Sequence, residues 1–340
     1  MRKLTSNVQK LVDLIAMKRD TTNIYLLVIL VVLIGVFSLM LPGKFFSTAN
    51  LQSIAFQVPE LGILSIAMMI ALLSGGLNLA IIVTANMAGI VAAAILTHFI
   101  PESASGAVTV LVIGMAVLAA LATALLIGIL NGWIIAFLGV SPILATLGTM
   151  TLIGGLNVAL TKGYVISGFP APILFIGNGV VFGIPMPMLI FAGCAVFVSL
   201  LLRRTAFGIS VYMMGSSEKA ALYSGIHIRK TLLKIYALSG FLCGIAALVM
   251  ISRFNSAKAG YASSYLLVTI LAAVLGGVDP FGGFGKMMGL VLALLVLQVI
   301  SSGLNLIGLS GHLPIALWGG ILIFVLFLNI LRDRFRGTRI

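Results

Sequence analysis

Charged residues are scarce in this 340-residue chain, where Asp, Glu, Lys and Arg together make up only 8% of the sequence. A soluble domain carries about a quarter. Because so few charges cannot keep a water-exposed surface dispersed, soluble enzymes and disordered proteins are excluded. The only two cysteines, Cys194 and Cys243, lie in apolar runs, which excludes a disulfide-stabilised secreted scaffold. With 61% hydrophobic residues, the chain is expected to cross a membrane several times.

Residues that could carry catalysis are equally scarce. The three histidines, His98, His227 and His312, are far apart, and no pair has the spacing of zinc ligands. The seven acidic residues form no carboxylate pair by spacing. Gly308–Gly311 reads GLSG and resembles the serine motif of rhomboid-type intramembrane proteases, but no histidine follows His312, so we interpret it as a turn. The chain is therefore predicted to be no enzyme and to bind no metal.

A phosphate-binding loop is lacking as well. A Walker A motif ending at Gly285-Lys286 needs glycine at position 280 and Ser or Thr at position 287, where the chain has Pro280 and Met287. We therefore expect this chain to bind no cofactor, and any ATP must be bound by a partner subunit.

The net charge of +13 does not indicate nucleic-acid binding. The basic residues form short clusters between apolar runs of membrane-spanning length. Clusters in such positions are typical of loops that are kept in the cytoplasm. A nucleic-acid interface needs a soluble basic patch with aromatic residues among the charges, and the sequence contains none. No nucleic-acid partner is expected.

The apolar runs predict an all-α polytopic membrane protein with about ten transmembrane helices. A helix needs roughly 20 apolar residues to cross the hydrocarbon layer. The alternating ten-residue segments of a membrane barrel do not occur. The predicted spans are 23–42, 53–74, 79–98, 107–137, 143–161, 183–202, 232–252, 264–278, 286–304 and 313–331.

The basic residues test the number of spans. With the N-terminus in the cytoplasm, sixteen of the twenty Lys and Arg residues fall on the cytoplasmic side. The four on the outer side are Lys44, Lys162, Arg253 and Lys258. Because basic residues near a span resist translocation, this asymmetry predicts that both termini are cytoplasmic.

These spans divide the chain into five segments. They are a cytoplasmic leader (1–22), transmembrane helices 1–6 (23–202), a cytoplasmic loop (203–231), transmembrane helices 7–10 (232–331) and a basic cytoplasmic tail (332–340). The loop is the one large excursion from the membrane. It is therefore the leading candidate surface for a partner protein.

Polar side chains inside apolar segments are the remaining functional signal, because burying them in lipid is costly. Glu60 lies in the second predicted span, and Asn78, Asn86 and Asn131 lie in or at the ends of others. An asparagine can also hydrogen-bond a neighbouring helix and serve packing alone. Packing is the favoured interpretation for each residue, with a translocation path as the alternative.

Small residues recur at four-residue spacing, at Gly128 and Gly132, Gly240 and Gly244, and Gly285 and Gly289. Such pairs let two helix backbones approach closely. Packing between helices of this chain is the favoured interpretation, with a subunit interface as the alternative.

Several motifs jointly resemble one family. Residues 204–208 read RTAFG and residues 214–226 read MGSSEKAALYSGI, which is similar to the cytoplasmic coupling segment of the ribose-type sugar permeases, the membrane subunits of ATP-binding-cassette (ABC) importers. The further matches, in the order of the family, are the NG of residues 131–132, the ATLGT of residues 145–149, the YALSG of residues 236–240, the AAVLGG of residues 272–277 and the SGLN of residues 302–305. The resemblance covers roughly residues 50–330.

This resemblance implies a permease of the bacterial inner (plasma) membrane, working as a homodimer or as a heterodimer with a second permease. Its implied partners are an ATP-binding subunit and a solute-binding protein. Coupling to the ATPase would use Gly215, Glu218, Ala221 and Gly225, with a short helix at about 217–224. The candidate residues for a translocation path are Glu60, Asn78, Asn86, Asn131 and Thr149, chosen as polar residues in or beside the apolar segments and not because the resemblance assigns them.

Two departures from the family pattern weaken any transfer of substrate identity. The family commonly reads GGIDLSVG where this chain has Asn78 in place of the aspartate. The usual acidic residue before the AAVLGG stretch is also absent, and Asp279 follows the glycines instead. The implied solute is small and polar, with a sugar favoured and a nucleoside or sugar-like signalling molecule as the alternative. An ATP-independent carrier is the next alternative, and it would preferably contain more membrane-buried ionisable residues.

Overall fold

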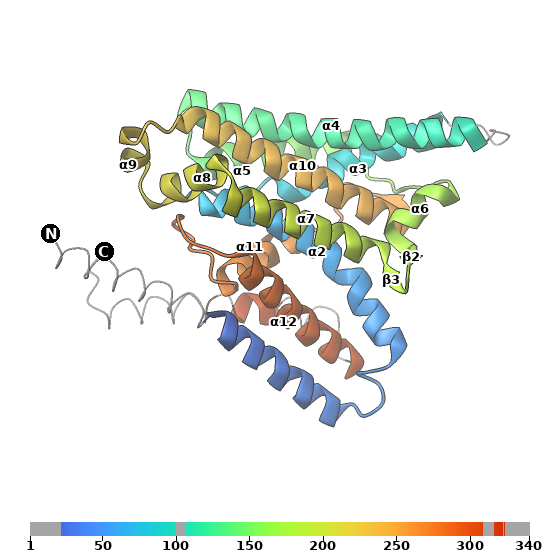
Figure 1. Ribbon diagram of the computed structural model, residues 1–340. Helices are drawn as coiled ribbons and strands as arrows, with labels where there is room; N and C mark the ends of the chain where they lie inside the picture. Colours follow the sequence, from blue (N-terminus) through green and yellow to red (C-terminus); the bar gives the residue numbers. More distant parts are fainter. Residues whose placement is uncertain (1–21, 100–105, 309–315, 322, 324–340) are drawn as a thin grey trace.

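Residues 22–99, 106–308, 316–321 and 323 are described by the computed structural model, in which helices form almost the whole molecule (Figure 1). The predicted all-α polytopic fold class is confirmed. The helices are Thr22–Met40, α2 (Thr48–Leu73), α3 (Ile81–His98), α4 (Gly106–Leu138), α5 (Pro142–Thr161), α6 (Ala171–Asn178), α7 (Met186–Arg204), α8 (Ala206–Ser216), α9 (Glu218–Tyr223), α10 (Ile228–Phe254), α11 (Tyr265–Leu275) and α12 (Met287–Leu306). The strands are β1 (Ile166–Ser167), β2 (Val180–Val181), β3 (Ile184–Pro185) and β4 (Ser256–Ala257), and they pair antiparallel as β1–β4 and β2–β3.

Eight helices in the described part of the chain are long and apolar enough to cross a membrane. They correspond to the first seven predicted spans and to the ninth. The tenth predicted span, 313–331, lies largely outside the described residues.

The predicted eighth span, 264–278, differs from the others. Its helix α11 has 11 residues and is only about 16 Å long, which is too short to cross the hydrocarbon layer. Helix α10 ends and helix α12 begins at opposite ends of the bundle (Figure 1). The chain therefore runs back across the bundle between them, through the largely irregular stretch 255–264 and then α11. Irregular backbone at membrane depth is tolerated only where protein or water satisfies its polar groups.

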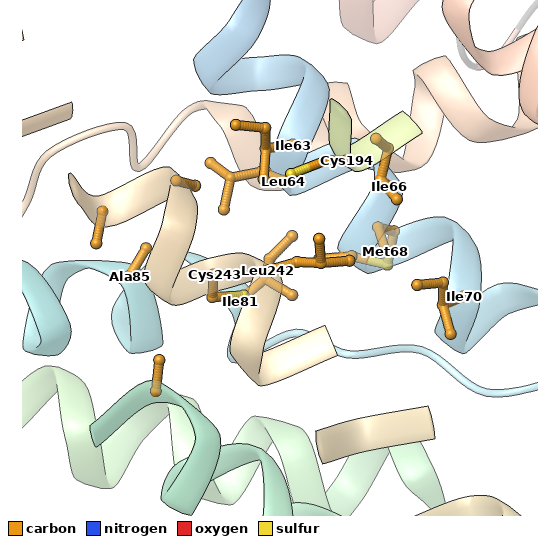
Figure 2. Close-up of a cluster of buried hydrophobic side chains, with 14 of the residues drawn as sticks. Ile63, Leu64, Ile66, Met68, Ile70, Ile81, Ala85, Cys194, Leu242 and Cys243 are labelled. Atoms are coloured by element: carbon orange, nitrogen blue, oxygen red, sulfur yellow. The ribbon is translucent and has the colours of Figure 1, made fainter. Parts of the chain in front are cut away.

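Helix α2 lies at the centre of the bundle. Every residue from Val58 to Leu73 is buried, because α7, α10, α11 and α12 all pack against it. A helix that is hydrophobic all round needs such a position. Figure 2 shows Ile63, Leu64, Ile66, Met68 and Ile70 of α2 in one cluster with side chains of α3, α7 and α10.

Two of the glycine pairs predicted to serve packing lie in one helix contact. A Cβ atom added at Gly128 of α4 would lie 3.0 Å from the Gly240 Cα of α10, and one added at Gly240 would lie 2.9 Å from the Gly128 Cα. The two backbones therefore touch, which confirms packing within the chain for these pairs. The third pair is not a helix stripe, because α12 begins at Met287, after Gly285.

The two ends of the bundle carry different structures (Figure 1). One end, the α8–α9 end, holds α8 and α9, which lie within the predicted cytoplasmic loop 203–231. The opposite end holds α6, the β2–β3 hairpin and the β1–β4 pair. Arg203 and Arg204 end α7 at the α8–α9 end, whereas Arg253 ends α10 at the opposite end. This placement agrees with the predicted sorting of basic residues.

The contact between α4 and α10 predicts opposite effects for two glycine-to-alanine substitutions. Gly240→Ala places a methyl group against the α4 backbone and should lower the free energy of unfolding by about 1–3 kcal/mol. The matched Gly148→Ala lies on α5, where nothing is within 4 Å, and should be neutral or stabilising by about 0.5–1 kcal/mol. Thermal unfolding in mild detergent measures both. Equal shifts in the two variants would contradict the close helix contact.

Candidate functional site

The predicted coupling segment folds as two short helices joined at a sharp corner. The Thr205 hydroxyl caps α8 by accepting from the Gly208 N–H at 3.3 Å, and the Ser217 hydroxyl caps α9 by accepting from the Ala220 N–H at 3.3 Å. Gly225, at φ +81°, follows the end of α9, a left-handed conformation that glycine adopts without penalty. The structure therefore has a helix where the sequence predicts one, at about 217–224.

Gly215 lies where the coupling segment meets the membrane-spanning core. A Cβ atom there would collide with the Leu73 carbonyl oxygen at the end of α2 and with the Gly283 amide. Only glycine lets α8 approach this closely. The end of α8 is thus packed on α2 and on the loop before α12.

The other three predicted coupling residues differ in exposure. Ala221 is fully buried and anchors α9, while Glu218 and Gly225 are exposed. Two large apolar side chains also face solvent here, Leu222 at 62% exposure and Tyr223 at 91%. Glu218 stands in the first turn of α9, where an acidic side chain is favoured by the helix dipole. Exposed apolar side chains beside an acidic one are the kind of surface that a partner protein covers.

Sequence reasoning missed the loop 279–285 as part of this surface. The Asp279 carboxylate accepts from the Phe281 N–H at 2.9 Å, and the Gly283 N–H donates to the Leu73 carbonyl at 2.9 Å. These bonds hold Phe281 at 89% exposure beside the coupling segment. The consecutive glycines 282 and 283, both with positive φ, are the sequence signal for this tight loop.

Glu60 is completely buried and forms an ion pair with a residue that sequence reasoning gave no role. Its Oε1 atom accepts from Arg253 Nη1 at 2.8 Å, and the Arg253 side chain is 20% exposed. The second carboxylate oxygen, Oε2, is buried without a hydrogen-bond partner. The pair joins α2 to the last turn of α10. No spacing rule could have linked two residues 193 positions apart.

Asn78, in the loop between α2 and α3, bonds helix α10, whereas Asn86 of α3 bonds the irregular backbone before α11. The Asn78 amide donates to the Ser239 hydroxyl at 2.9 Å, and its oxygen accepts from the Ala80 N–H at 3.2 Å. The Asn86 amide donates to the carbonyls of Ala259 at 2.9 Å and Tyr261 at 3.0 Å. Asn86 therefore satisfies the irregular backbone that precedes α11.

Asn131 and Thr149 bond each other between α4 and α5. The Thr149 hydroxyl lies 2.6 Å from the Asn131 oxygen, and the Asn131 amide nitrogen is buried without a partner. The structure does not gather the five predicted path residues into one site. Each is bonded to a residue on an element other than its own. A contact between any of them and the solute stays a prediction.

No group of three or more His, Cys, Asp or Glu residues that could hold a metal ion occurs among the residues described. What this arrangement offers is a packed helical core, a built surface at the α8–α9 end and one buried ion pair near the opposite end.

The contacts of Asn86 predict the effect of an isosteric change. Asn86→Asp replaces the side-chain amide, which donates two hydrogen bonds, by a carboxylate. This carboxylate then faces the two carbonyl oxygens that the amide had bonded. The substitution should lower the free energy of unfolding by about 2 kcal/mol or more, since buried acceptors lose their donor. Thermal unfolding in detergent is the measurement, with Asn305→Asp at an exposed position as the matched control. A stable Asn86→Asp protein with impaired transport would instead favour a path role.

Comparison with known proteins identifies a family and a set of similar sequences. The family described as "Branched-chain amino acid transport system / permease component" matches residues 50–331. Similar curated proteins include the "Autoinducer 2 import system permease protein LsrD" of Yersinia pseudotuberculosis serotype O:3 (strain YPIII) and serotype IB (strain PB1/+), and that of Yersinia pestis (strain Pestoides F). Each is 34% identical over 271 residues, which covers 78% of this chain and 78% of the relative.

Proposed function

The chain belongs to the branched-chain amino acid transport system / permease component family, the non-enzymatic membrane subunits of ABC importers in the bacterial inner membrane, and on this premise we propose how it couples and what it carries. A partner ATPase binds the surface formed by α9 and the end of α8, and ATP is hydrolysed on that partner. The single observation that carries this proposal is α9 itself, a capped helix that holds Leu222 and Tyr223 in solvent.

The position of Gly215 supports the transmission of force from that surface. Because the end of α8 touches the Leu73 carbonyl, a displacement of α9 by the ATPase acts on the buried helix α2 without an intervening flexible segment. Interiors packed this tightly transmit strain. We therefore assign Gly215 and Ala221 to holding the coupling segment on the core, and Glu218, Leu222 and Tyr223 to contacting the ATPase.

The proposed solute is small, polar and of the carbohydrate class. The relatives named above import autoinducer 2 by their printed names, which makes a sugar-like signalling molecule the second candidate. We propose autoinducer 2 and simple sugars as the first solutes to assay. A solute-binding protein on the outer face would supply most of the specificity, since the five residues predicted for the path already have partners within the chain.

The remaining partner is a second permease, either another copy or a sister chain. Large parts of α4, α5 and α7 expose apolar side chains, including Leu126, Leu152 and Phe197. These faces are available to lipid and to a partner permease.

The experiment that tests the proposed function is purification of the tagged full-length chain from its own host in mild detergent, followed by ATPase assays. We expect an ATPase subunit to co-purify and its hydrolysis to rise with a solute-loaded binding protein. A chain that purifies alone and moves solute into vesicles without ATP would contradict the proposal.

Surface variants at the α8–α9 end sharpen this test. Glu218→Lys and Leu222→Asp should each reduce ATPase retention about tenfold or more, as hot-spot substitutions do, while the thermal midpoint stays unchanged. Phe182→Asp is the matched control, because Phe182 is fully exposed but lies in the β2–β3 turn at the opposite end. Retention of the ATPase by both coupling variants would show that α9 is not the contact.

A further inference from the structure

Glu60 and Arg253 form the single ion pair among the residues that the structure describes. Glu60 of α2 is fully buried, and its second carboxylate oxygen has no hydrogen-bond partner. Arg253 of α10 is therefore the residue that balances the negative charge of Glu60. A charged residue inside a membrane-spanning segment, as predicted for Glu60, is rare because its burial is costly, and such residues commonly mark function. Nothing in the coupling surface itself accounts for this pair.

Each of the two helices joined by this pair has one terminus at the coupling surface. Helix α10 begins at Ile228, three positions after Gly225. Helix α2 ends at Leu73, whose carbonyl accepts from Gly283 at 2.9 Å and touches Gly215. The segment α8–α9 therefore contacts one helix directly and leads into the other. The ion pair joins the middle of α2 to the last turn of α10, at the end of α10 away from the coupling surface.

Between the ion pair and the coupling surface, a second contact sets the register of the two helices. The Ser239 hydroxyl of α10 donates to the Ala67 carbonyl of α2 at 3.0 Å and accepts from the Asn78 amide at 2.9 Å. Sliding α10 along α2 would break this bond and the ion pair together. Helices α2 and α10 pack against each other (Figure 1), and the coupling segment is attached to both.

The last turn of α10 also carries the structures at the opposite end of the bundle. The Asn178 amide of α6 donates to the Ser252 carbonyl at 2.9 Å, and the Phe169 N–H donates to the Asn255 side chain at 3.0 Å. The β1–β4 pair adds Ser167 opposite Ser256. Arg253 therefore sits in the turn that supports the face on which a solute-binding protein would dock.

We propose that Arg253 and Glu60 are a positioning pair that holds α2 and α10 in one register, so that docking on the outer face is coupled to the ATPase at α9. The inference rests on the proposed function and extends it to residues outside the coupling surface. While the ion pair is formed, the last turn of α10 cannot shift against the middle of α2, so a movement of one helix is passed to the other. Loss of the pair leaves the coupling surface intact, but docking on the outer face then no longer affects the ATPase.

The test uses the complete importer reconstituted in lipid, with ATP hydrolysis measured with and without the solute-loaded binding protein. In Glu60→Gln, the shape is kept and Arg253 is partly exposed, so no charge is left fully buried. We expect the stimulation ratio to fall about fivefold or more, within the usual size of coupling between sites. Arg253→Lys keeps the charge and should retain the ratio, as should the outer-side control Lys44→Gln.

A double variant separates a coupling role from a folding role. Glu60→Gln with Arg253→Gln leaves no unpaired charge, and it should lose stimulation no further than Glu60→Gln alone, because partners in one pair are not additive. An unchanged ratio in Glu60→Gln and in the double variant, with only a lower thermal midpoint, would overturn the inference and leave the proposed function standing. A wild-type complex without any stimulated hydrolysis would instead overturn the proposed function, and the inference with it.

Discussion

Every backbone polar group at membrane depth has to find its partner inside the protein, and the architecture of this permease follows from that requirement. In the described part of the chain, eight helices long and apolar enough to span a membrane satisfy this requirement through their own backbone hydrogen bonds. The irregular stretch before α11 cannot, and it borrows the amide of Asn86 for two of its carbonyls. The loop between α2 and α3 likewise receives a bond from the Thr146 hydroxyl to the Leu77 carbonyl. Buried polar side chains therefore support the non-helical backbone.

The same packing connects the coupling surface to the core. Gly215 and Gly283 bring α8 and the loop before α12 onto the end of α2, the most deeply buried helix. In the proposed function, the membrane-spanning helices move when the partner ATPase hydrolyses ATP, and tightly packed cores shift between discrete arrangements. A helix buried over Val58–Leu73 is well suited to carry such a shift from one end of the bundle to the other.

Sequence reasoning recovered most elements of the fold because apolar length and charge placement are local signals. The first seven predicted spans and the ninth have matching helices, and the glycine pairs of α4 and α10 meet as expected. The eighth span was placed correctly but is a short helix after an irregular stretch, since hydropathy measures burial and not helical length. The coupling residues were found through motif resemblance, and their roles stay proposals.

The sequence by itself determined that the chain crosses a membrane many times, that it lacks a Walker A motif and that its largest polar excursion lies between α7 and α10. These follow from composition and from short motifs. Only the tertiary structure decided which polar residues are partners. Glu60 meets Arg253, and Asn78 meets Ser239, across 193 and 161 positions. Such contacts depend on how helices pack, and packing is a property of the whole chain that no local pattern contains.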